Sequence, residues 1–499
     1  MTGKSKVLEN SFFYMFSSLL VKAIGFFLLP VYTYFLTPED YGITNLVNGF
    51  NSVATFIVAF SLYQAVMRFY VDYKNDREKL KRFYGSVTCF VFLSSLVFLL
   101  VSIAVNELIV SLFFEGVDFF PVVLIALVTL CFLSVHSVHQ SMLQGMQKGK
   151  KLTLINIVVF LIQVALNLVM IGVLRMGAVG VLLAALIVNV GYMVFMLIDV
   201  RRNDLMEFCL DKRLLKEALK YSIPIMPHNL STHIASFASR IFINREGSLG
   251  AVGLYGVAMQ FGALVDIVQV SVNKAFAPWF YDVMNRRDKE AKEEILEMSR
   301  LLLILYSLVY LVIGLFSQEV VILMTNENYT LAWTAIPILV VGYSIKSIYY
   351  FYVNILFFHK EAARRIFIAT VSGSLADILF AAILVPLAGM YGAAIAFLIA
   401  KVIVVSIVVF MARKYNDIGY RLVDMLKTIL PSFLFIGFGL FFSYTRYINE
   451  FSMFNLIFKL AVLGAYILFI YLTNIRIFRG LGKRLLVLRR KHIRGTGKD

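Results

Sequence analysis

Charged residues, proline and cysteine are scarce in this sequence, and the scarcity excludes several classes of protein. Only 15% of the 499 residues are charged, 9 are proline and 3 are cysteine, whereas 60% are hydrophobic. A soluble protein has about a quarter of its residues charged, so a soluble globular fold is excluded. Cys89, Cys131 and Cys209 are too few and too scattered for a disulfide framework or a metal-binding motif.

Enzyme signatures are missing as well. The sequence contains no GxxxxGK[ST], HExxH or GxSxG motif. His136 and His139 lie three residues apart in an apolar run, but too few further ligands lie nearby for a metal site. We therefore expect a buried or interfacial polar pair there, and we expect the protein not to be an enzyme and to need no cofactor.

Long apolar runs are what the sequence has in excess. The mean hydropathy is +0.82, and runs of about 20 residues can cross a hydrocarbon core of about 30 Å as helices. The first run, 11–36, is too long for a cleavable signal peptide. We predict an all-α polytopic membrane protein with about fourteen transmembrane helices. These are expected at residues 11–36, 43–67, 83–105, 119–143, 152–174, 178–198, 218–243, 251–279, 301–317, 331–357, 365–386, 389–411, 427–445 and 455–475.

The basic residues are distributed unevenly between the two sides of the membrane. The formal net charge is +17. If the spans alternate from a cytoplasmic N-terminus, most of the 47 Lys and Arg residues lie on one side, and only Arg175, Arg245 and Arg446 lie in loops on the other. This asymmetry follows the positive-inside rule. We predict that both termini are cytoplasmic and that the protein does not bind nucleic acid.

The sequence repeats itself at an offset of about 211 residues. The segment 41–43 (Tyr-Gly-Ile) aligns with 252–254 (Val-Gly-Leu), and 177–180 (Gly-Ala-Val-Gly) aligns with 389–392 (Gly-Met-Tyr-Gly). Each repeat holds six spans, so the two must have the same orientation and be related by an axis along the membrane normal. We predict an N-lobe, a C-lobe, two further helices and a basic cytoplasmic tail, at residues 1–205, 206–424, 425–475 and 476–499.

Several charged residues fall at membrane depth. A charge at the bilayer centre costs about 2.5–3.5 kcal/mol, so some of these side chains must face water or each other. Arg68, Lys401 and Lys459 lie near span ends, where we expect them to extend toward the headgroups. We expect a cavity around Lys22, Arg240, Lys274 and Lys346, and the two acids at this depth, Asp377 and Asp266, are candidates for ion coupling.

Helical spacing supports a cationic cavity between the lobes. Asn229, His233, Ser236 and Arg240 lie at i, i+4, i+7 and i+11, which places them on one helix face. The repeat aligns Lys22 with His233, so the same helix face is polar in both lobes. A cationic cavity selects an anion, because Arg and Lys form strong charge-assisted hydrogen bonds with phosphate. Either a small anion or a pyrophosphate on a larger molecule satisfies this chemistry.

Two segments resemble a known family. The Phe-Leu-Thr-Pro-Glu-Asp-Tyr-Gly segment at 35–42, and the Leu-Lys-Tyr-Ser-Ile-Pro-Ile-Met-Pro-His segment at 219–228 followed by Arg240, are similar to those of polysaccharide biosynthesis and O-antigen flippases. That family belongs to the multidrug/oligosaccharidyl-lipid/polysaccharide exporter superfamily. The resemblance covers about residues 5–475.

This resemblance implies a multi-pass flippase of the bacterial inner membrane. Its substrate would be an undecaprenyl-pyrophosphate-linked oligosaccharide, moved by alternating access of the two lobes and coupled to Na⁺ or H⁺. By similarity to peptidoglycan-precursor flippases, Lys22 and Lys274 suit the cavity and Asp377 suits the ion site. The seventh span offers Asn229 where those relatives have an acid, which departs from their sodium site. Membrane lipids and a sugar polymerase or glycosyltransferase are the expected partners.

Three other functions stay open at this point. A peptidoglycan or teichoic-acid precursor flippase would need the same cationic cavity. A multidrug efflux pump would carry organic cations and favour acidic cavity residues. In this sequence basic residues outnumber acidic ones at membrane depth. A membrane-embedded glycosyltransferase or polymerase would show a long outer loop with acids or histidine, and none is found.

Overall fold

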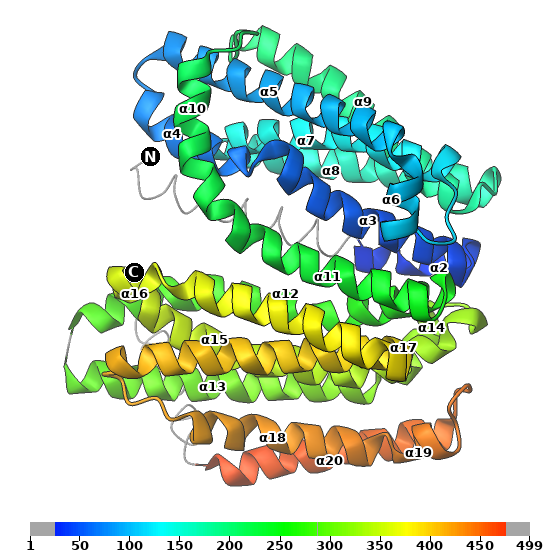
Figure 1. The fold of residues 1–499 in the computed structure, drawn as a ribbon. Coiled ribbons are helices and arrows are strands. Elements are labelled where there is room, and N and C mark those ends of the chain that lie inside the picture. The colour runs from blue at the N-terminus through cyan, green and yellow to red at the C-terminus, as the bar shows by residue number, and fades with distance from the viewer. Residues whose placement is uncertain (1–24, 287, 476–499) are drawn as a thin grey trace, which may run out of the picture.

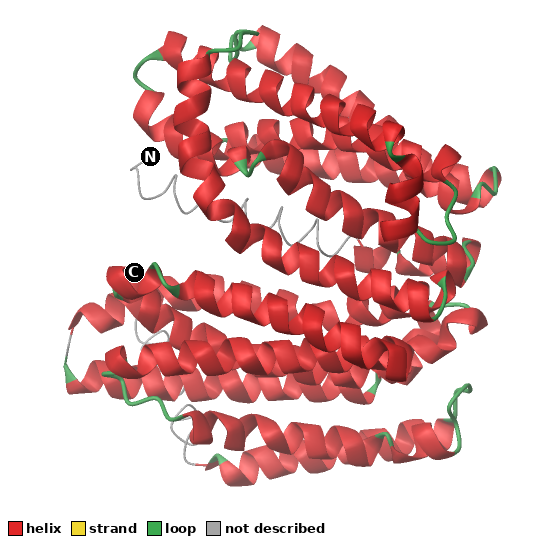
Figure 2. Cartoon of the chain, viewed as in Figure 1, coloured by secondary structure: helices red, strands yellow, loops and turns green. Residues whose placement is uncertain are grey.

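The computed structural model describes residues 25–286 and 288–475, and every regular element in these two ranges is a helix (Figure 2). The first helices form one bundle (Figure 1). Its elements are α2 (Leu29–Phe35), α3 (Pro38–Ala59), α4 (Leu62–Tyr73), α5 (Arg77–Ala104), α6 (Asn106–Phe113), η1 (Phe119–Val123), α7 (Leu124–Gly145), α8 (Gly149–Asn167), η2 (Leu168–Val173) and α9 (Gly177–Arg202).

A second bundle follows, and α10 (Lys212–Ser222) with η3 (Ile223–Ile225) leads into it from the first (Figure 1). The helices α18 and α20 pack on α13 and form the layer farthest from the first bundle. The elements are α11 (Met226–Glu246), α12 (Leu249–Arg286), α13 (Lys289–Leu315), α14 (Ser317–Met324), η4 (Glu327–Ala335), α15 (Ile336–Phe358), α16 (Lys360–Ala363), α17 (Ile366–Ala412), η5 (Arg413–Tyr415), α18 (Leu422–Gly439), α19 (Phe441–Thr445) and α20 (Met453–Thr473).

The all-helical, multi-pass character predicted from the sequence is confirmed. Ten helices in the described ranges are long and apolar enough to cross a membrane, or eleven if the bent pair of α3 and α4 counts as one span. Large apolar side chains cover the outside of the bundles, among them Leu387, Leu434 and Val173 at 77%, 75% and 74% exposure. Such a surface is stable against lipid but not against water.

The number of apolar membrane-spanning helices differs from the predicted fourteen for three reasons. Most of the first expected span lies outside the described residues, which hold only its end, Gly25–Phe35. The seventh, α11, forms a helix of 21 residues, but its polar stripe removes it from the apolar spans. The eleventh and twelfth are joined in the 47-residue element α17.

The element α17 is a helical hairpin rather than one long helix. Its backbone leaves the helical region at Gly389, where φ is 53° and ψ is −130°. A β-carbon on Gly373 would lie 2.1 Å from Cγ2 of Val404, and one on Gly392 would lie 2.1 Å from the carbonyl oxygen of Leu384. Residues on either side of Gly389 therefore pack against each other in antiparallel order.

The start of α3 is fixed by the Thr-Pro-Glu-Asp segment noted in the sequence. The Thr37 hydroxyl accepts a hydrogen bond from the Asp40 amide at 3.1 Å, and the Asp40 carboxylate accepts one from the Thr37 amide at 3.4 Å. This reciprocal capping box, with Pro38 in the first turn, stabilises a helix N-terminus. Asp40 also accepts a hydrogen bond from the Ala178 amide at 2.9 Å, which ties α3 to the start of α9.

The two bundles meet where α3 crosses α12. A β-carbon on Gly42 would lie 1.8 Å from the carbonyl oxygen of Leu249, and one on Gly253 would lie 2.1 Å from that of Pro38. Only glycine permits backbones to approach so closely. Gly42 and Gly253 are equivalent positions of the sequence repeat, so the repeat places its matching glycines face to face. Away from this crossing the bundles diverge (Figure 1).

Candidate substrate and ion site in the second lobe

A pocket of about 420 Å³ lies within the second bundle, between α11, α12, α15 and α17. Each of these helices contributes polar side chains to its wall. The residues Ser236 and Ser239 of α11, Asn273 of α12, Lys346 and Tyr350 of α15, and Thr370, Ser374, Asp377 and Lys401 of α17 line it. The pocket thus gathers charges from segments that are far apart in the sequence.

Lys346 carries one of the two positive charges of this pocket. Its Nζ lies 2.7 Å from Oδ1 of Asp266, and both side chains are partly buried. The same ammonium lies 5.7 Å from the ring centroid of Tyr350. Asp266 therefore balances Lys346 in this structure.

Lys401 carries the second positive charge, contrary to its expected position at the headgroups. It lines the pocket, and its Nζ lies 4.5 Å above the Phe397 ring. Lys401 and Asp377 are each twelve residues from Gly389, on opposite arms of the α17 hairpin. Equal arms of an antiparallel hairpin place both residues at the same depth, about 18 Å from the turn. That symmetry is the sequence signal that could have identified Lys401.

Asp377 is the acidic group of the pocket wall. Its side chain is buried, and its Oδ1 has no hydrogen-bond partner among the described residues. A buried carboxylate oxygen without a donor is costly and is suited to bind a cation or a proton. Thr370 and Ser374 line the same wall and offer further oxygen atoms. Oxygen ligands of this kind are what hard cations prefer.

Arg240 lies at the edge of the pocket, at the contact between the lobes. Its NH1 donates to the carbonyl oxygen and to Oγ of Ser236, each at 2.7 Å, whereas its Nε is buried and has no acceptor among the described residues. A β-carbon on Gly49 of α3 would lie 3.4 Å from Cδ of Arg240. The guanidinium is therefore held beside the pocket with donors that are not all used.

The other expected site residues lie outside the lining of this pocket. His233 packs against Phe56 of α3, with ring centroids 4.8 Å apart. Asn229 has a buried Nδ2 atom with no acceptor in the described part of the chain, and Lys274 is exposed on α12. Lys22 lies outside the described residues. The structure thus brings Asp377 and Lys346 together in one pocket, joins Asp266 to it through Lys346, and places Arg240 at its edge.

The expectation that Lys459 extends to the headgroups is wrong. Its side chain is fully buried, and Nζ lies 2.7 Å and 2.8 Å from the two carboxylate oxygens of Glu319 and 3.3 Å from Oε1 of Gln318. Asn455 donates to the same Gln318 oxygen at 3.1 Å. The acid that retains Lys459 comes from α14, 140 residues away in the chain, so local sequence could not reveal the pair.

The predicted polar pair on the fourth expected span is confirmed. His139 is fully buried, with Nδ1 2.9 Å from the Tyr192 hydroxyl and Nε2 3.3 Å from Oδ2 of Asp199. His136 stacks on Tyr192 at 3.5 Å between ring centroids. Lys151 forms an ion pair with the same Asp199. This cluster joins α7, α8 and α9 and lies in the first bundle, away from the pocket.

Comparison with known proteins agrees with this architecture. The family model described as "Polysaccharide biosynthesis protein" matches residues 7–284, which is more than half of the chain. Comparison with curated protein sequences gives no significant match.

Several solved transporter structures have the same fold. One is the lipid II flippase MurJ in an inward closed conformation, with 17% identity, a TM-score of 0.65, and coverage of 94% of this chain and 100% of that one. Another is an inward-facing multidrug resistance MATE transporter of the MOP superfamily, with 17% identity, a TM-score of 0.64, and coverage of 82% and 96%. An outward-facing MATE transporter gives 17% identity, a TM-score of 0.53, and coverage of 83% and 96%. At these identities the likeness concerns the fold.

Proposed function

Because the chain belongs to the polysaccharide biosynthesis protein family, we propose that it flips an undecaprenyl-pyrophosphate-linked oligosaccharide across the bacterial inner membrane. The oligosaccharide is an O-antigen, capsule or exopolysaccharide repeat unit, and the two lobes move by alternating access. The protein works as a transporter and not as an enzyme, in agreement with its family and fold.

The observation that carries this proposal is the cationic group of the second lobe. Lys346 and Lys401 line one pocket. Arg240 lies beside it, bonded to Ser236 of its wall, and its buried Nε has no acceptor among the described residues. Three cations exceed the two acids, Asp266 and Asp377, so the group attracts an anion. A pyrophosphate accepts several charge-assisted hydrogen bonds and satisfies a guanidinium and ammonium groups together. In this proposal Lys22 and Lys274 add further positive charge for the anion, and His233 and Asn229 add polar contacts.

The ion-coupling group in this proposal is Asp377. Its carboxylate lines the pocket, and Oδ1 receives no hydrogen bond from the described residues. Binding of Na⁺ or H⁺ there would neutralise the carboxylate. Asp266 is a weaker choice because Lys346 already balances its charge. Binding of the cation favours the conformation in which Asp377 stays buried, which is how a coupled ion biases alternating access.

The proposed topology has fourteen crossings with both termini in the cytoplasm. Support comes from the hairpin in α17, which adds one crossing to the apolar spans, and from α11, which is long enough to cross although it is polar. The loop between α9 and α10 carries Arg201, Arg202 and Lys212, as expected for the cytoplasmic side. Membrane lipids surround the bundles, and a sugar polymerase or glycosyltransferase receives or supplies the substrate.

A flippase for peptidoglycan or teichoic-acid precursors is the second candidate, because its substrates share the polyprenyl-linked phosphate headgroup. The fold of MurJ, described as a lipid II flippase, favours keeping this alternative. A multidrug efflux pump is the weaker reading, since organic cations would be repelled by Lys401 and Lys346.

The test is transport in proteoliposomes that contain a fluorescent undecaprenyl-pyrophosphate oligosaccharide. Replacing Lys401 by Gln should lower the flipping rate about tenfold or more, since one charge-assisted contact is lost. Arg240→Lys keeps the charge but loses the bidentate donor geometry, so we expect a partial loss. Lys216→Gln removes an exposed charge of α10 and serves as the matched control.

Normal flipping by Lys401→Gln and Arg240→Gln, at normal protein levels, would contradict the pyrophosphate site. Faster efflux of an organic cation by the parent protein than flipping of the lipid-linked sugar would instead favour the drug-pump reading.

A further inference from the structure

A second and larger pocket lies far from the candidate site, at one end of α13, α18 and α20. Its volume is about 540 Å³. It opens where α18 begins and α20 ends, in the layer of the second bundle farthest from the first (Figure 1). Under the topology proposed above, this end of the three helices lies at the cytoplasmic surface of the membrane.

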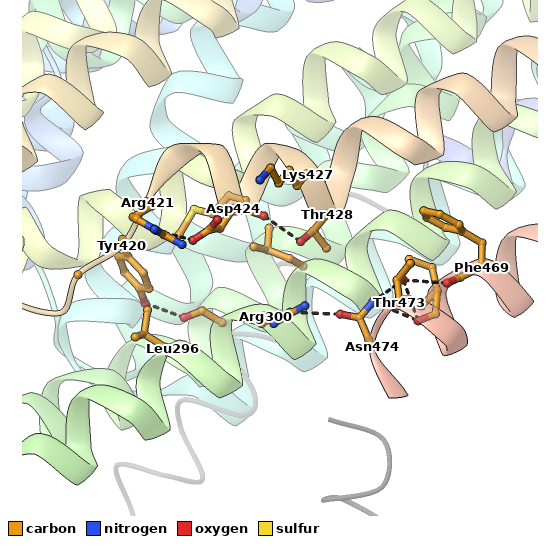
Figure 3. Close-up of a pocket in the computed structure, with 15 residues that line it drawn as sticks. Leu296, Arg300, Tyr420, Arg421, Asp424, Lys427, Thr428, Phe469, Thr473 and Asn474 are labelled. Atoms are coloured by element: carbon orange, nitrogen blue, oxygen red, sulfur yellow. Dashed lines mark hydrogen bonds and ion pairs between the residues drawn. The ribbon is translucent and has the colours of Figure 1, made fainter. Parts of the chain in front are cut away.

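The pocket has an apolar wall and a separate group of charged residues. Leu296, Leu303, Met425, Phe469 and Ile470 form its apolar wall, and Arg300, Arg421, Lys427 and Asp424 supply its charges (Figure 3). Asp424 is already paired with Arg421, with 2.7 Å between Oδ2 and Nε. Two positive charges, on Arg300 and Lys427, are left without an acid inside the pocket.

The donors of these two residues are available for a ligand. Arg300 uses Nε to donate to Oδ1 of Asn474 at 3.2 Å, which orients the guanidinium while NH1 and NH2 make no hydrogen bond among the described residues (Figure 3). Lys427 has no hydrogen-bond or ion-pair partner in the described parts of the chain. An orienting contact on one nitrogen and unused donors on the others are the arrangement that binds an oxyanion.

The neighbouring hydroxyl groups are engaged within the protein and do not compete for that anion. Thr428 donates to the Asp424 carbonyl oxygen at 3.0 Å, and Thr473 donates to the Phe469 carbonyl oxygen at 2.8 Å. Ser299 and the Tyr420 hydroxyl bond to each other at 2.6 Å. Recognition in this pocket therefore depends on Arg300 and Lys427.

We propose that this pocket binds the headgroup phosphate of an anionic phospholipid, with Arg300 and Lys427 on the phosphate and the apolar wall against the upper acyl chain. A basic pocket between transmembrane helices near the cytoplasmic surface is the site that such headgroups occupy. The bound lipid links α13 to the α18–α20 pair, which forms the layer of the second bundle farthest from the first (Figure 1). This lipid site is separate from the transported substrate.

The experiment measures lipid binding to the full chain by native mass spectrometry after detergent exchange. The ligands are phosphatidylglycerol, phosphatidylcholine, inorganic phosphate and undecaprenyl pyrophosphate, each added alone and in competition. We expect one phosphatidylglycerol to remain bound at energies that remove phosphatidylcholine. The double variant Arg300→Gln, Lys427→Gln should weaken this binding about tenfold or more.

Matched variants separate the site from general charge and from folding. Lys216→Gln combined with Arg364→Gln removes two exposed charges elsewhere and should bind phosphatidylglycerol like the parent. Thr428→Trp fills the pocket with both charges kept and should also weaken binding, which tests the site even if the double variant does not fold.

Three results would overturn the proposal. One is phosphatidylglycerol binding unchanged by both the double variant and Thr428→Trp. Another is retention of phosphatidylcholine equal to that of phosphatidylglycerol, because the positive charges would then not select an anionic headgroup. The last is displacement of phosphatidylglycerol by undecaprenyl pyrophosphate or by inorganic phosphate at lower concentration, which would assign the pocket to the transported lipid or to free phosphate.

Discussion

At the scale of single residues, the charged side chains of this protein differ in how they are neutralised. Lys459 and Glu319 form a fully enclosed pair, whereas Arg68 and Asp72 pair at 2.7 Å with about half of each side chain exposed. Removing one partner of a buried pair leaves an uncompensated charge, while an exposed pair adds little. Substitutions of lysines and arginines that look alike in the sequence should therefore differ in their effect on stability.

We predict that Lys459→Met lowers the stability of the detergent-solubilised protein by about 3–5 kcal/mol, because Glu319 stays buried without a counter-charge. Thermal unfolding followed by tryptophan fluorescence measures this. The double variant Lys459→Met, Glu319→Leu should recover most of the loss, and Arg68→Ala should leave the midpoint nearly unchanged. A Lys459→Met protein as stable as the Arg68→Ala protein would refute the role of the buried pair.

Asp377 allows a prediction on coupling. A pyrophosphate leaving an inside-negative cell gains about 2.3 kcal/mol per charge per 100 mV, so the empty carrier's return is the step that needs a coupled cation. Asp377→Asn should therefore slow multiple turnover and abolish the dependence on Na⁺ or pH, while single-turnover flipping is less affected. Proteoliposomes with imposed gradients measure both rates. Normal turnover with the parent's ion dependence would show that Asp377 couples nothing.

At the scale of elements, the turn inside α17 determines where Asp377 and Lys401 lie. Gly389 adopts a positive φ with no atom near its missing β-carbon, so only the backbone conformation resists substitution. We expect Gly389→Ala to cost about 1–3 kcal/mol in stability. Gly464→Ala, in the middle of α20 and equally open, should be neutral or stabilising by up to about 1 kcal/mol. Thermal unfolding of the two variants distinguishes them, and equal midpoints would mean that the turn carries no strain.

The sequence predicted the helices well because apolar runs of membrane length are long and strongly patterned. Class, helix positions and the buried histidine pair followed from local spacing. The polar face of α11 and the depth of Asp377 in the membrane also followed from spacing. These two features predicted part of the site. What local pattern could not supply were contacts between distant segments: Lys401 beside Asp377 across the hairpin, and Glu319 against Lys459. Both lysines were placed at the lipid headgroups because their partners lie 24 and 140 residues away.

At the scale of the whole molecule, the two bundles are held together at one end. There Tyr329 donates to the Thr37 carbonyl oxygen at 2.7 Å, Asn326 donates to that of Thr33 at 2.6 Å, and Asn244 donates to that of Glu115 at 2.6 Å. These contacts must break if the two bundles separate at this end.

We predict that a disulfide between Asn45→Cys and Gly256→Cys stops transport, because it prevents α3 and α12 from separating. A β-carbon on Gly256 would lie 2.7 Å from the Asn45 side chain, so the two positions are adjacent. Flipping assays under oxidising conditions should show loss of activity, and reduction should restore it. Each single cysteine serves as a control. Full activity of the cross-linked protein would mean that this crossing does not open.

Membrane orientation gives a further prediction. Single cysteines at positions 39, 115, 246 and 327 should react with an impermeant reagent added to intact cells, whereas those at 77, 204, 288 and 490 should react only after permeabilisation. Labelling of position 77 or 288 in intact cells would reverse the proposed topology.

The crossing of Gly42 and Gly253 has a consequence for the ancestry of the chain. Two equivalent residues that touch across an axis form an isologous contact, the type found in symmetric dimers. With both repeats oriented alike, a polypeptide of half this length could have met a second copy of itself at the same glycine. Fusion of two such copies into one chain would have kept this existing interface. The sequences of the two halves could then have diverged. The pocket around Lys401 lies in the second lobe and the His139 cluster in the first, as expected if the two halves acquired different polar groups after such a fusion.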